Sequence, residues 1–231
     1  MGAQRFVVEL LARSPLSGRV HRLRFASQSP FRWAAGQHLV VVGASGQALF
    51  LPYSLASAYD PQKPHEFELA VAYRAGADAL DALEVGARLE VEGPFGSFVW
   101  QAEPQPAALL VGVGTGIAPL RALIEEELAR AASTRLLLLA GHRAAEDILF
   151  AEDFAQLASE HARFEFMPTL TLAGPDWSGK RGRVQAQLGA AVSALGGLDV
   201  FVCGRLDMVR TVVSALAELG VAGPRIRSEG F

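Results

Sequence analysis

The sequence has little cysteine, no long apolar run and no excess of positive charge. Cys203 is the single cysteine of 231 residues, which excludes an internal disulfide and an iron–sulfur cluster held by four cysteines of this chain. No apolar run approaches the ~20 residues of a membrane-spanning helix, and the N-terminus lacks a signal-peptide pattern. The 21 basic and 24 acidic residues give a net charge of −3. We therefore expect a cytoplasmic protein with no membrane or nucleic-acid partner and no metal site.

Glycine, by contrast, is concentrated at one place. The segment Gly112-Val113-Gly114-Thr115-Gly116 follows the apolar run 107–111 and precedes a helical pattern. Strand, glycine turn and helix together direct free N–H groups and the positive end of a helix dipole to one point, which suits a phosphate or pyrophosphate. The spacing differs from the usual dinucleotide fingerprint and lacks the lysine of a P-loop. A tight turn without a ligand is the alternative.

The hydrophobic periodicity changes near the middle of the chain. Residues 1–102 carry short alternating strands with turn residues between them, which predicts an antiparallel barrel or sandwich with one short helical stretch at 78–83. The polar segment 101–106 contains two prolines and resembles a linker. From residue 107 apolar strands alternate with helices, which predicts a parallel sheet. The expected strands are 107–111, 136–140, 164–170 and 200–203, and the expected helices are 119–130, 147–159, 184–195 and 207–219.

Ligands of parallel α/β sheets bind beyond the carboxyl ends of the strands. In this sequence those ends carry the segments 112–115, 142–143, 169–172 and 203–205. The residues alone leave simpler interpretations open: Cys203 as a small buried residue, His142 and Arg143 as a solvated loop, and Phe231 as a frayed terminus.

A series of short motifs occurs in order along nearly the whole chain. The motifs are Ala35-Gly36-Gln37, Pro52-Tyr53-Ser54, Gly93-Pro94-Phe95-Gly96, the segment 112–119, the segment 177–184, the segment 203–208 and Glu229-Gly230-Phe231. Together they resemble the ferredoxin–NADP reductase superfamily, and the Gly-Arg-x-x-Met variant within 203–208 is most similar to NAD(P)H:flavin oxidoreductases. The resemblance implies an N-terminal antiparallel flavin-binding β-barrel at 1–102 and a C-terminal α/β parallel-sheet NAD(P)-binding domain at 107–231.

The resemblance also implies an activity: hydride transfer from NADH or NADPH to FAD or FMN, bound or as a substrate, with the electrons passed to an acceptor. On the flavin side, Tyr53 would stack near the ring, Ser54 would hydrogen-bond flavin N5, and Tyr73 and Gly76 would line the ring. The chemistry belongs to the cofactors, and the protein positions them.

On the nucleotide side, the glycine turn and Thr115 would hold the pyrophosphate and ribose. Cys203 and Gly204 would lie beside the nicotinamide, and Glu229 and Phe231 would close the site. The catalytic candidates are Ser54, Cys203 and Glu229. The cofactor-binding candidates are Pro52, Tyr53, Ser54, Tyr73, Arg74, Gly76, Gly112, Gly114, Thr115, Gly116, His142, Arg143, Cys203, Gly204, Arg205 and Phe231.

The sequence departs from the family at the flavin phosphate. Leu51 stands where the family usually has arginine, and Ala79 stands where it usually has serine or threonine. Two phosphate contacts are therefore missing, which predicts weak flavin binding, with Arg74 as the candidate substitute. A degenerate, non-catalytic reductase-like subunit or nucleotide sensor is the alternative function. A separate electron-acceptor protein is a variant of the enzyme hypothesis.

Nucleotide preference depends on the end of the second strand of the parallel sheet. His142 and Arg143 lie there, and no acidic residue stands at 141–143 to repel a 2′-phosphate. We expect both NADH and NADPH to be used without large discrimination.

Overall fold

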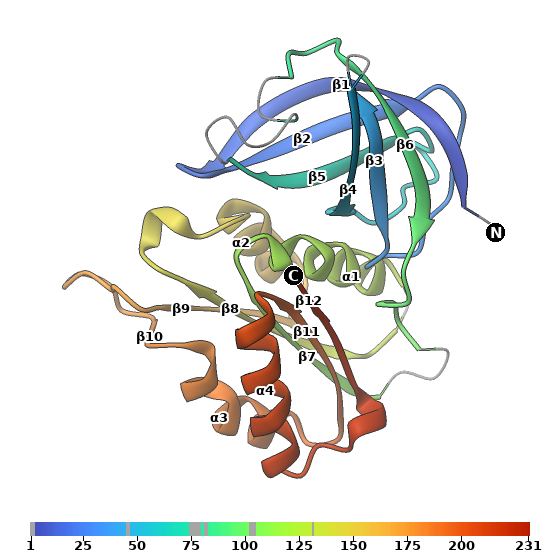
Figure 1. Ribbon diagram of the computed structural model, residues 1–231. Coiled ribbons are helices and arrows are strands. Elements are labelled where there is room, and N and C mark those ends of the chain that lie inside the picture. The colour runs from blue at the N-terminus through green and yellow to red at the C-terminus, as the bar shows by residue number, and fades with distance from the viewer. Residues whose placement is uncertain (1–2, 45–46, 74–79, 81–82, 102–104, 131) are drawn as a thin grey trace.

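The computed structural model describes residues 3–44, 47–73, 80, 83–101, 105–130 and 132–231. Most of the predicted helical stretch 78–83 and half of the predicted linker 101–106 lie outside these residues, so the proposed division of the chain near 101–106 stays a prediction. Two six-stranded sheets make up the described part of the chain, one in each half (Figure 1).

The N-terminal half forms the predicted antiparallel barrel. Its strand order is β4-β3-β6-β1-β2-β5, and a single bridge between Leu55 and Leu69 brings the two outer strands together. Alternate residues of each strand point inward, and the largest inward side chains include Phe25 and Phe67, whose rings stack at 5.6 Å. The strands are β1 (Gln4–Ser17), β2 (Val20–Ser27), β3 (His38–Ala44), β4 (Gln47–Ser54), β5 (Glu66–Ala72) and β6 (Arg88–Phe95).

The C-terminal half forms the predicted parallel sheet, with strand order β10-β9-β8-β7-β11-β12. Its elements are β7 (Ala107–Val113), η1 (Gly114–Gly116), α1 (Ile117–Ala129), β8 (Arg135–His142), η2 (Ala145–Asp147), α2 (Ala151–Glu160), β9 (Phe164–Leu170), β10 (Lys180–Arg181), η3 (Val184–Gln187), α3 (Leu188–Leu195), β11 (Leu198–Gly204), α4 (Leu206–Glu218), η4 (Gly223–Arg225) and β12 (Ile226–Gly230).

The expected boundaries need correction at two helices. The second helix begins at Ala151 rather than at 147, because Phe150 before it has a left-handed backbone with φ of 56°. The third is divided: residues 184–187 form a 3₁₀ turn, and the α-helix begins at Leu188. The strand β12 was not predicted, because its sequence is short and has no run of apolar residues.

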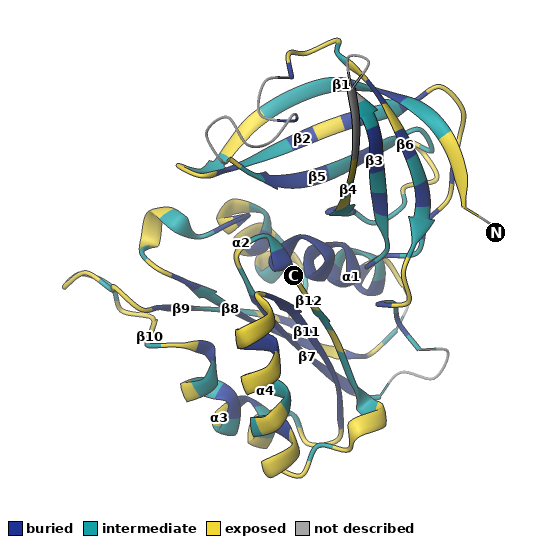
Figure 2. Cartoon of the chain, in the orientation of Figure 1, coloured by how far each residue is buried: buried dark blue, intermediate teal, exposed yellow. Residues whose placement is uncertain are grey.

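Helices cover both faces of the parallel sheet, and one of these helix layers also meets the barrel. Ala108 and Leu110 of β7 point to α1 and the barrel, whereas Leu109 and Val111 point to α3 and α4. Figure 1 shows α1 and α2 between the sheet and the barrel. In Figure 2 α1 is buried along most of its length, whereas α3 and α4 keep exposed outer faces. The sequence of α1 is therefore apolar on more than one side.

The two halves share a packed interface. The Trp100 ring lies 4.8 Å from the Phe201 ring, and its indole N–H donates a 3.0 Å hydrogen bond to the carbonyl of Leu123. Backbone N–H groups of Ala35 and Ala58 in the barrel donate 2.9 Å hydrogen bonds to carboxylates of α1. These contacts pack the barrel against α1 and against the face of the sheet that α1 covers.

None of the helices in the described part of the chain is long and apolar enough to cross a membrane.

Candidate functional site

The glycine turn forms a single 3₁₀ turn, η1, at the carboxyl end of β7. Its three glycines serve different purposes. Gly114 has φ of +54° and open space around it. A Cβ on Gly116 would lie 2.5 Å from the carbonyl of Cys203, and one on Gly112 would lie 2.6 Å from the Leu120 side chain. Only Gly114 therefore has room for a ligand, and the other two allow the turn to pack on β11 and α1.

The N-terminus of α1 keeps the property that the sequence predicted. No side chain caps η1 or α1, so their first N–H groups have no side-chain acceptor among the described residues. Pro119 lies in the first turn of α1, where a missing N–H is harmless. The half-buried Thr115 lies beside these groups. The turn is therefore suited to hold an anion.

The sheet register brings three predicted residues into one row. Cys203 on β11 pairs with Gly112 on one side and with Glu229 on the other. The Cys203 side chain is fully buried, and burial, followed by the charge of Glu229, raises the pKa of its thiol. Burial likewise raises the pKa of the Glu229 carboxyl. Cys203 therefore remains a protonated thiol and is not a nucleophile.

The segment after β12 is held in place rather than frayed. The N–H of Phe231 donates a 3.1 Å hydrogen bond to the carbonyl of Gly204, and Leu206 N–H donates to the carbonyl of Phe231 at 3.3 Å. The Phe231 side chain is nevertheless 61% exposed, so an apolar ring is available beside the row of Gly112, Cys203 and Glu229. Figure 1 shows this end of the chain between the barrel and the sheet.

The predicted flavin residues lie along the open seam of the barrel. Beyond the bridge from Leu55 to Leu69, β4 and β5 share no ladder among the described residues, so the barrel has an open seam between these two strands. Pro52, Tyr53 and Ser54 occupy the β4 edge. Tyr73 follows β5, is 44% exposed and packs edge-on against His21. Since β5 also contacts η1, the seam borders the glycine turn.

Tyr53 and Ser54 belong to opposite faces of β4. Tyr53 pairs with the buried Leu39 and packs partly on the barrel core, whereas Ser54 pairs with His38. A ring that contacts both residues must therefore lie at the end of β4 rather than across one face. Leu51 shares the Tyr53 face. Arg74, Gly76 and Ala79 lie outside the described residues.

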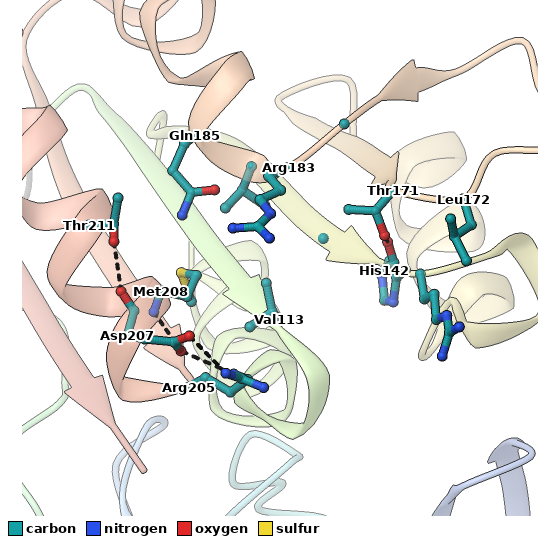
Figure 3. A pocket seen from close by; sticks show the side chains of 14 residues that line it. Val113, His142, Thr171, Leu172, Arg183, Gln185, Arg205, Asp207, Met208 and Thr211 are labelled. Carbon is teal, nitrogen blue, oxygen red and sulfur yellow. Dashed lines mark hydrogen bonds and ion pairs between the residues drawn. The ribbon is translucent and has the colours of Figure 1, made fainter.

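A pocket of about 670 Å³ opens at the carboxyl ends of β7, β8, β9 and β11. Predicted residues His142, Arg143 and Arg205 line it, as expected for a parallel sheet. Figure 3 shows Arg183 and Gln185 extending from one side and Arg205 and Asp207 from another. The pocket ends next to Val113, the last residue of β7 before the glycine turn.

The charges of this pocket differ from those that the sequence suggested. His142 is buried, and burial lowers its pKa to about 4, so it is neutral near pH 7. Arg205 forms a bidentate pair with Asp207, at 3.0 and 2.8 Å. Arg143 and Arg183 are exposed, and neither forms an ion pair within the described residues. The cations available to a ligand are therefore Arg143 and Arg183.

Sequence reasoning missed part of this pocket. Arg183 and Gln185 were not candidates, although Arg183 belongs to a recognised motif, and Thr211 was also missed. Thr171 falls within the strand-end segment 169–172 but was not named as a site residue. Their positions in the sequence were the available clue to a place in the pocket, because Thr171 follows β9 and Arg183 and Gln185 precede α3. A motif shows that a segment is present but does not show which of its side chains face the ligand.

A second pocket of about 570 Å³ lies between the barrel and β12. His38, Gly96, Ser97 and Phe98 line it from the barrel side, and residues 227–229 line it from β12. Among the described residues of its lining, Glu229 is the one that the sequence predicted as a site residue.

An antiparallel barrel with an open seam, joined to a parallel nucleotide-binding sheet with a glycine turn, defines a class of two-domain oxidoreductases. Comparison with known families agrees: residues 7–100 match the oxidoreductase FAD-binding domain, and residues 110–214 match the oxidoreductase NAD-binding domain. The chain belongs to the ferredoxin–NADP reductase superfamily, and it is an oxidoreductase whose cofactors are a flavin and NAD(P)H.

Individual relatives support this assignment over the whole chain. Ferredoxin–NADP reductase B of Sorangium cellulosum is 36% identical over 243 aligned positions, which cover 99% of this chain and 98% of the relative. An NAD(P)H-flavin reductase of Vibrio harveyi is 29% identical and covers 84% of each chain. The crystal structure of an Amycolatopsis cytochrome P450 reductase superposes with a TM-score of 0.90 at 29% identity, over 99% of this chain and 70% of that one.

Proposed function

We propose that this enzyme transfers a hydride from NAD(P)H to a flavin held in the seam between β4 and β5, and passes the electrons to a separate acceptor. In this proposal residues 1–102 bind the flavin and residues 107–231 bind the nucleotide. The observation that carries it is the placement of the seam: β5 contacts the glycine turn, so the two cofactor sites adjoin.

The residues fit these groups. The flavin supplies the redox chemistry when it is bound. The open seam between β4 and β5 would admit the edge of a flavin ring, Ser54 at the end of β4 would donate a hydrogen bond to it, and Tyr53 would contribute part of its ring. The uncapped start of α1, with Thr115, is suited to the nucleotide pyrophosphate. Burial keeps the Cys203 thiol protonated, so it places no charge beside the reacting ring, and burial also raises the pKa of the Glu229 carboxyl.

Stopped-flow mixing tests the hydride step. The protein is loaded with FAD, or with FMN, and mixed with NADH or NADPH without oxygen. We expect the flavin absorbance near 450 nm to bleach, and we expect slower bleaching in Ser54→Ala. Absence of bleaching with either nucleotide and either flavin would contradict the proposal.

The acceptor is proposed from the relatives. The Sorangium relative is named for ferredoxin and the Amycolatopsis structure for cytochrome P450, and both names indicate a protein that receives electrons. We propose a separate redox protein as the physiological acceptor here. Turnover of free flavin that matches turnover with any protein acceptor would instead make the flavin itself the substrate.

Both nucleotides are proposed as donors. Arg143 and Arg183 provide positive charge for the 2′-phosphate of NADPH. The other residues that line the 670 Å³ pocket do not depend on a 2′-phosphate. We expect kcat/KM values for NADPH and NADH to lie within about 100-fold of each other, equivalent to ~2.7 kcal/mol. Arg183→Ala should lower kcat/KM for NADPH roughly 10-fold and leave NADH nearly unchanged. An equal loss for both nucleotides would contradict this role of Arg183.

A further inference from the structure

The second pocket, between the barrel and β12, has an apolar side and polar walls. The rings of Phe98 and Phe201 meet edge to face at 5.5 Å beside it. His38 of β3 lies on the barrel wall, and Arg227 and Glu229 of β12 lie on the opposite wall. Its volume of about 570 Å³ is sufficient for a small molecule.

Strand register places this pocket beside both halves of the proposed redox site. On the barrel side His38 pairs directly with Ser54. On the sheet side Arg227 pairs with Phe201, and Glu229 pairs with Cys203 two residues further along. Phe201 and Cys203 both belong to the core cluster that faces the barrel, so Arg227 and Glu229 share this face. A molecule in the pocket is therefore adjacent to the strands that carry Ser54 and Cys203.

The polar groups of the pocket are not satisfied by the protein. The Nη1 atom of Arg227 and the Nδ1 atom of His38 are both buried, and neither has a hydrogen-bond partner among the described residues. The guanidinium of Arg227 lies 5.9 Å from the centre of the Phe201 ring and forms no ion pair within the same part of the chain. A buried, unpaired N–H group of a guanidinium is costly unless a ligand satisfies it, and planar anions are its best partners.

One group in the pocket opposes an anion. Glu229 lies two residues from Arg227 on the same face of β12. Burial raises the pKa of its carboxyl. The buried Nη1 of Arg227 has no acceptor among the described residues, so a group in the lining that still needs a partner is a guanidinium N–H. Such a group favours a ligand that presents negative charge to it.

We propose that the second pocket binds small anionic electron acceptors and that Arg227 selects them. The inference rests on the proposed function, because it needs a reduced flavin as the source of electrons. Ferricyanide, a trianion, is a suitable probe. One NAD(P)H supplies two electrons and a proton as hydride; two ferricyanide ions each take one electron and become ferrocyanide, and one proton is released to water.

The test compares ferricyanide with menadione, a neutral acceptor that takes two electrons and needs no anion site. Steady-state rates are measured with the full chain at saturating FAD and NADPH and at constant ionic strength, because screening alters charge effects. In Arg227→Gln we expect kcat/KM for ferricyanide to fall at least ~10-fold and kcat/KM for menadione to change less than twofold. Arg227→Lys should recover part of the loss, since it restores charge without the planar fork.

Arg135→Gln is the matched control. Arg135 is exposed at the start of β8, at the end of the sheet opposite the site, and its loss changes the net charge equally. If Arg135→Gln lowers ferricyanide turnover as much as Arg227→Gln does, the effect is long-range steering and the proposal is wrong. An equal loss for menadione in Arg227→Gln would show a purely structural role. If the wild type reduces neither acceptor, the proposed function itself fails.

Discussion

At the scale of single residues, Leu51 gives a test of the predicted weak grip on the flavin phosphate. It shares a face of β4 with Tyr53, so an arginine there would lie on the same side as the residue proposed to stack on the flavin ring. Leu51→Arg should tighten FMN and FAD roughly 10- to 100-fold relative to riboflavin, because a charge-assisted hydrogen bond to phosphate contributes about 1.5–3 kcal/mol. Quenching of flavin fluorescence in titrations of all three flavins measures this difference.

The wild type serves as the reference for that series. Weak phosphate recognition predicts similar affinity for riboflavin and FAD, and a purified protein that is nearly colourless. Tight FAD binding that is unchanged by Leu51→Arg and lost in Arg74→Ala would instead assign the phosphate to Arg74.

The buried His142 leads to a prediction of how the stability of the fold depends on pH. Its pKa falls from 6.5 to about 4 on folding, because the charged form is buried. Between these two values the unfolded chain binds a proton that the folded protein does not, so stability falls as the pH is lowered from 6.5 to 4. The loss is about 3 kcal/mol at the lower end. Urea unfolding at several pH values should show this decline, and His142→Gln should remove most of it; an identical decline in the variant would contradict the assignment.

At the scale of elements, the junction between η1 and β11 decides whether the glycine turn keeps its shape. Gly116→Ala would place a Cβ 2.5 Å from three backbone atoms of Cys203 and Gly204, and none of them belongs to a flexible side chain. We expect the free energy of unfolding to fall by about 2 kcal/mol and NAD(P)H binding to weaken, since the turn must move.

Gly189→Ala is the matched control for this substitution. Gly189 lies in α3 with an ordinary backbone, and nothing stands within 4 Å of its would-be Cβ. Alanine there should stabilise the protein by about 0.5–1 kcal/mol. Urea unfolding separates the two variants, and a neutral Gly116→Ala would show that the turn has more freedom than its packing indicates.

At the scale of the whole molecule, a buried ion-pair network joins the two halves. Arg121 of α1 donates 2.8 and 2.7 Å hydrogen bonds to the Glu68 carboxylate and the Ala56 carbonyl of the barrel, and it pairs with Glu125 at 2.8 Å. Arg22 of β2 reaches Asp153 of α2. Both arginines also lie over the Phe150 ring. The network holds the seam of the barrel against the glycine turn.

Arg121→Met should therefore lower the free energy of unfolding by about 3–5 kcal/mol, because it removes the buried guanidinium that pairs with the half-buried carboxylates of Glu68 and Glu125. Arg88→Met removes an exposed pair with Glu9 and should cost less than about 1 kcal/mol. Chemical unfolding gives both values, and hydride transfer to bound flavin should slow in Arg121→Met alone. Equal stabilities of the two variants would mean that water replaces the network at little cost.

Sequence alone determined the two architectures and the order of the motifs. In the first half, apolar and polar residues alternate with a period of two. In the second half, apolar strands alternate with helices. Both patterns are local, because each depends on residues that are close together in the sequence. The glycine turn was predicted for the same reason, and so was the edge of the sheet at which ligands bind. The family resemblance, carried by these motifs, supplied the cofactors.

Only the tertiary structure decided which residues meet across the molecule. The sequence suggested that His142 contributes positive charge at the end of β8. Burial by the surrounding residues lowers the pKa of His142, so its side chain is neutral near pH 7. Gly116 and Gly112 serve packing against β11 and α1, which no local pattern reveals. Arg183, Arg227 and His38 acquire their pockets from segments far apart in the chain. Burial, pKa and pocket lining are properties of neighbours in space, and the order of residues along a chain does not specify them until the chain is folded.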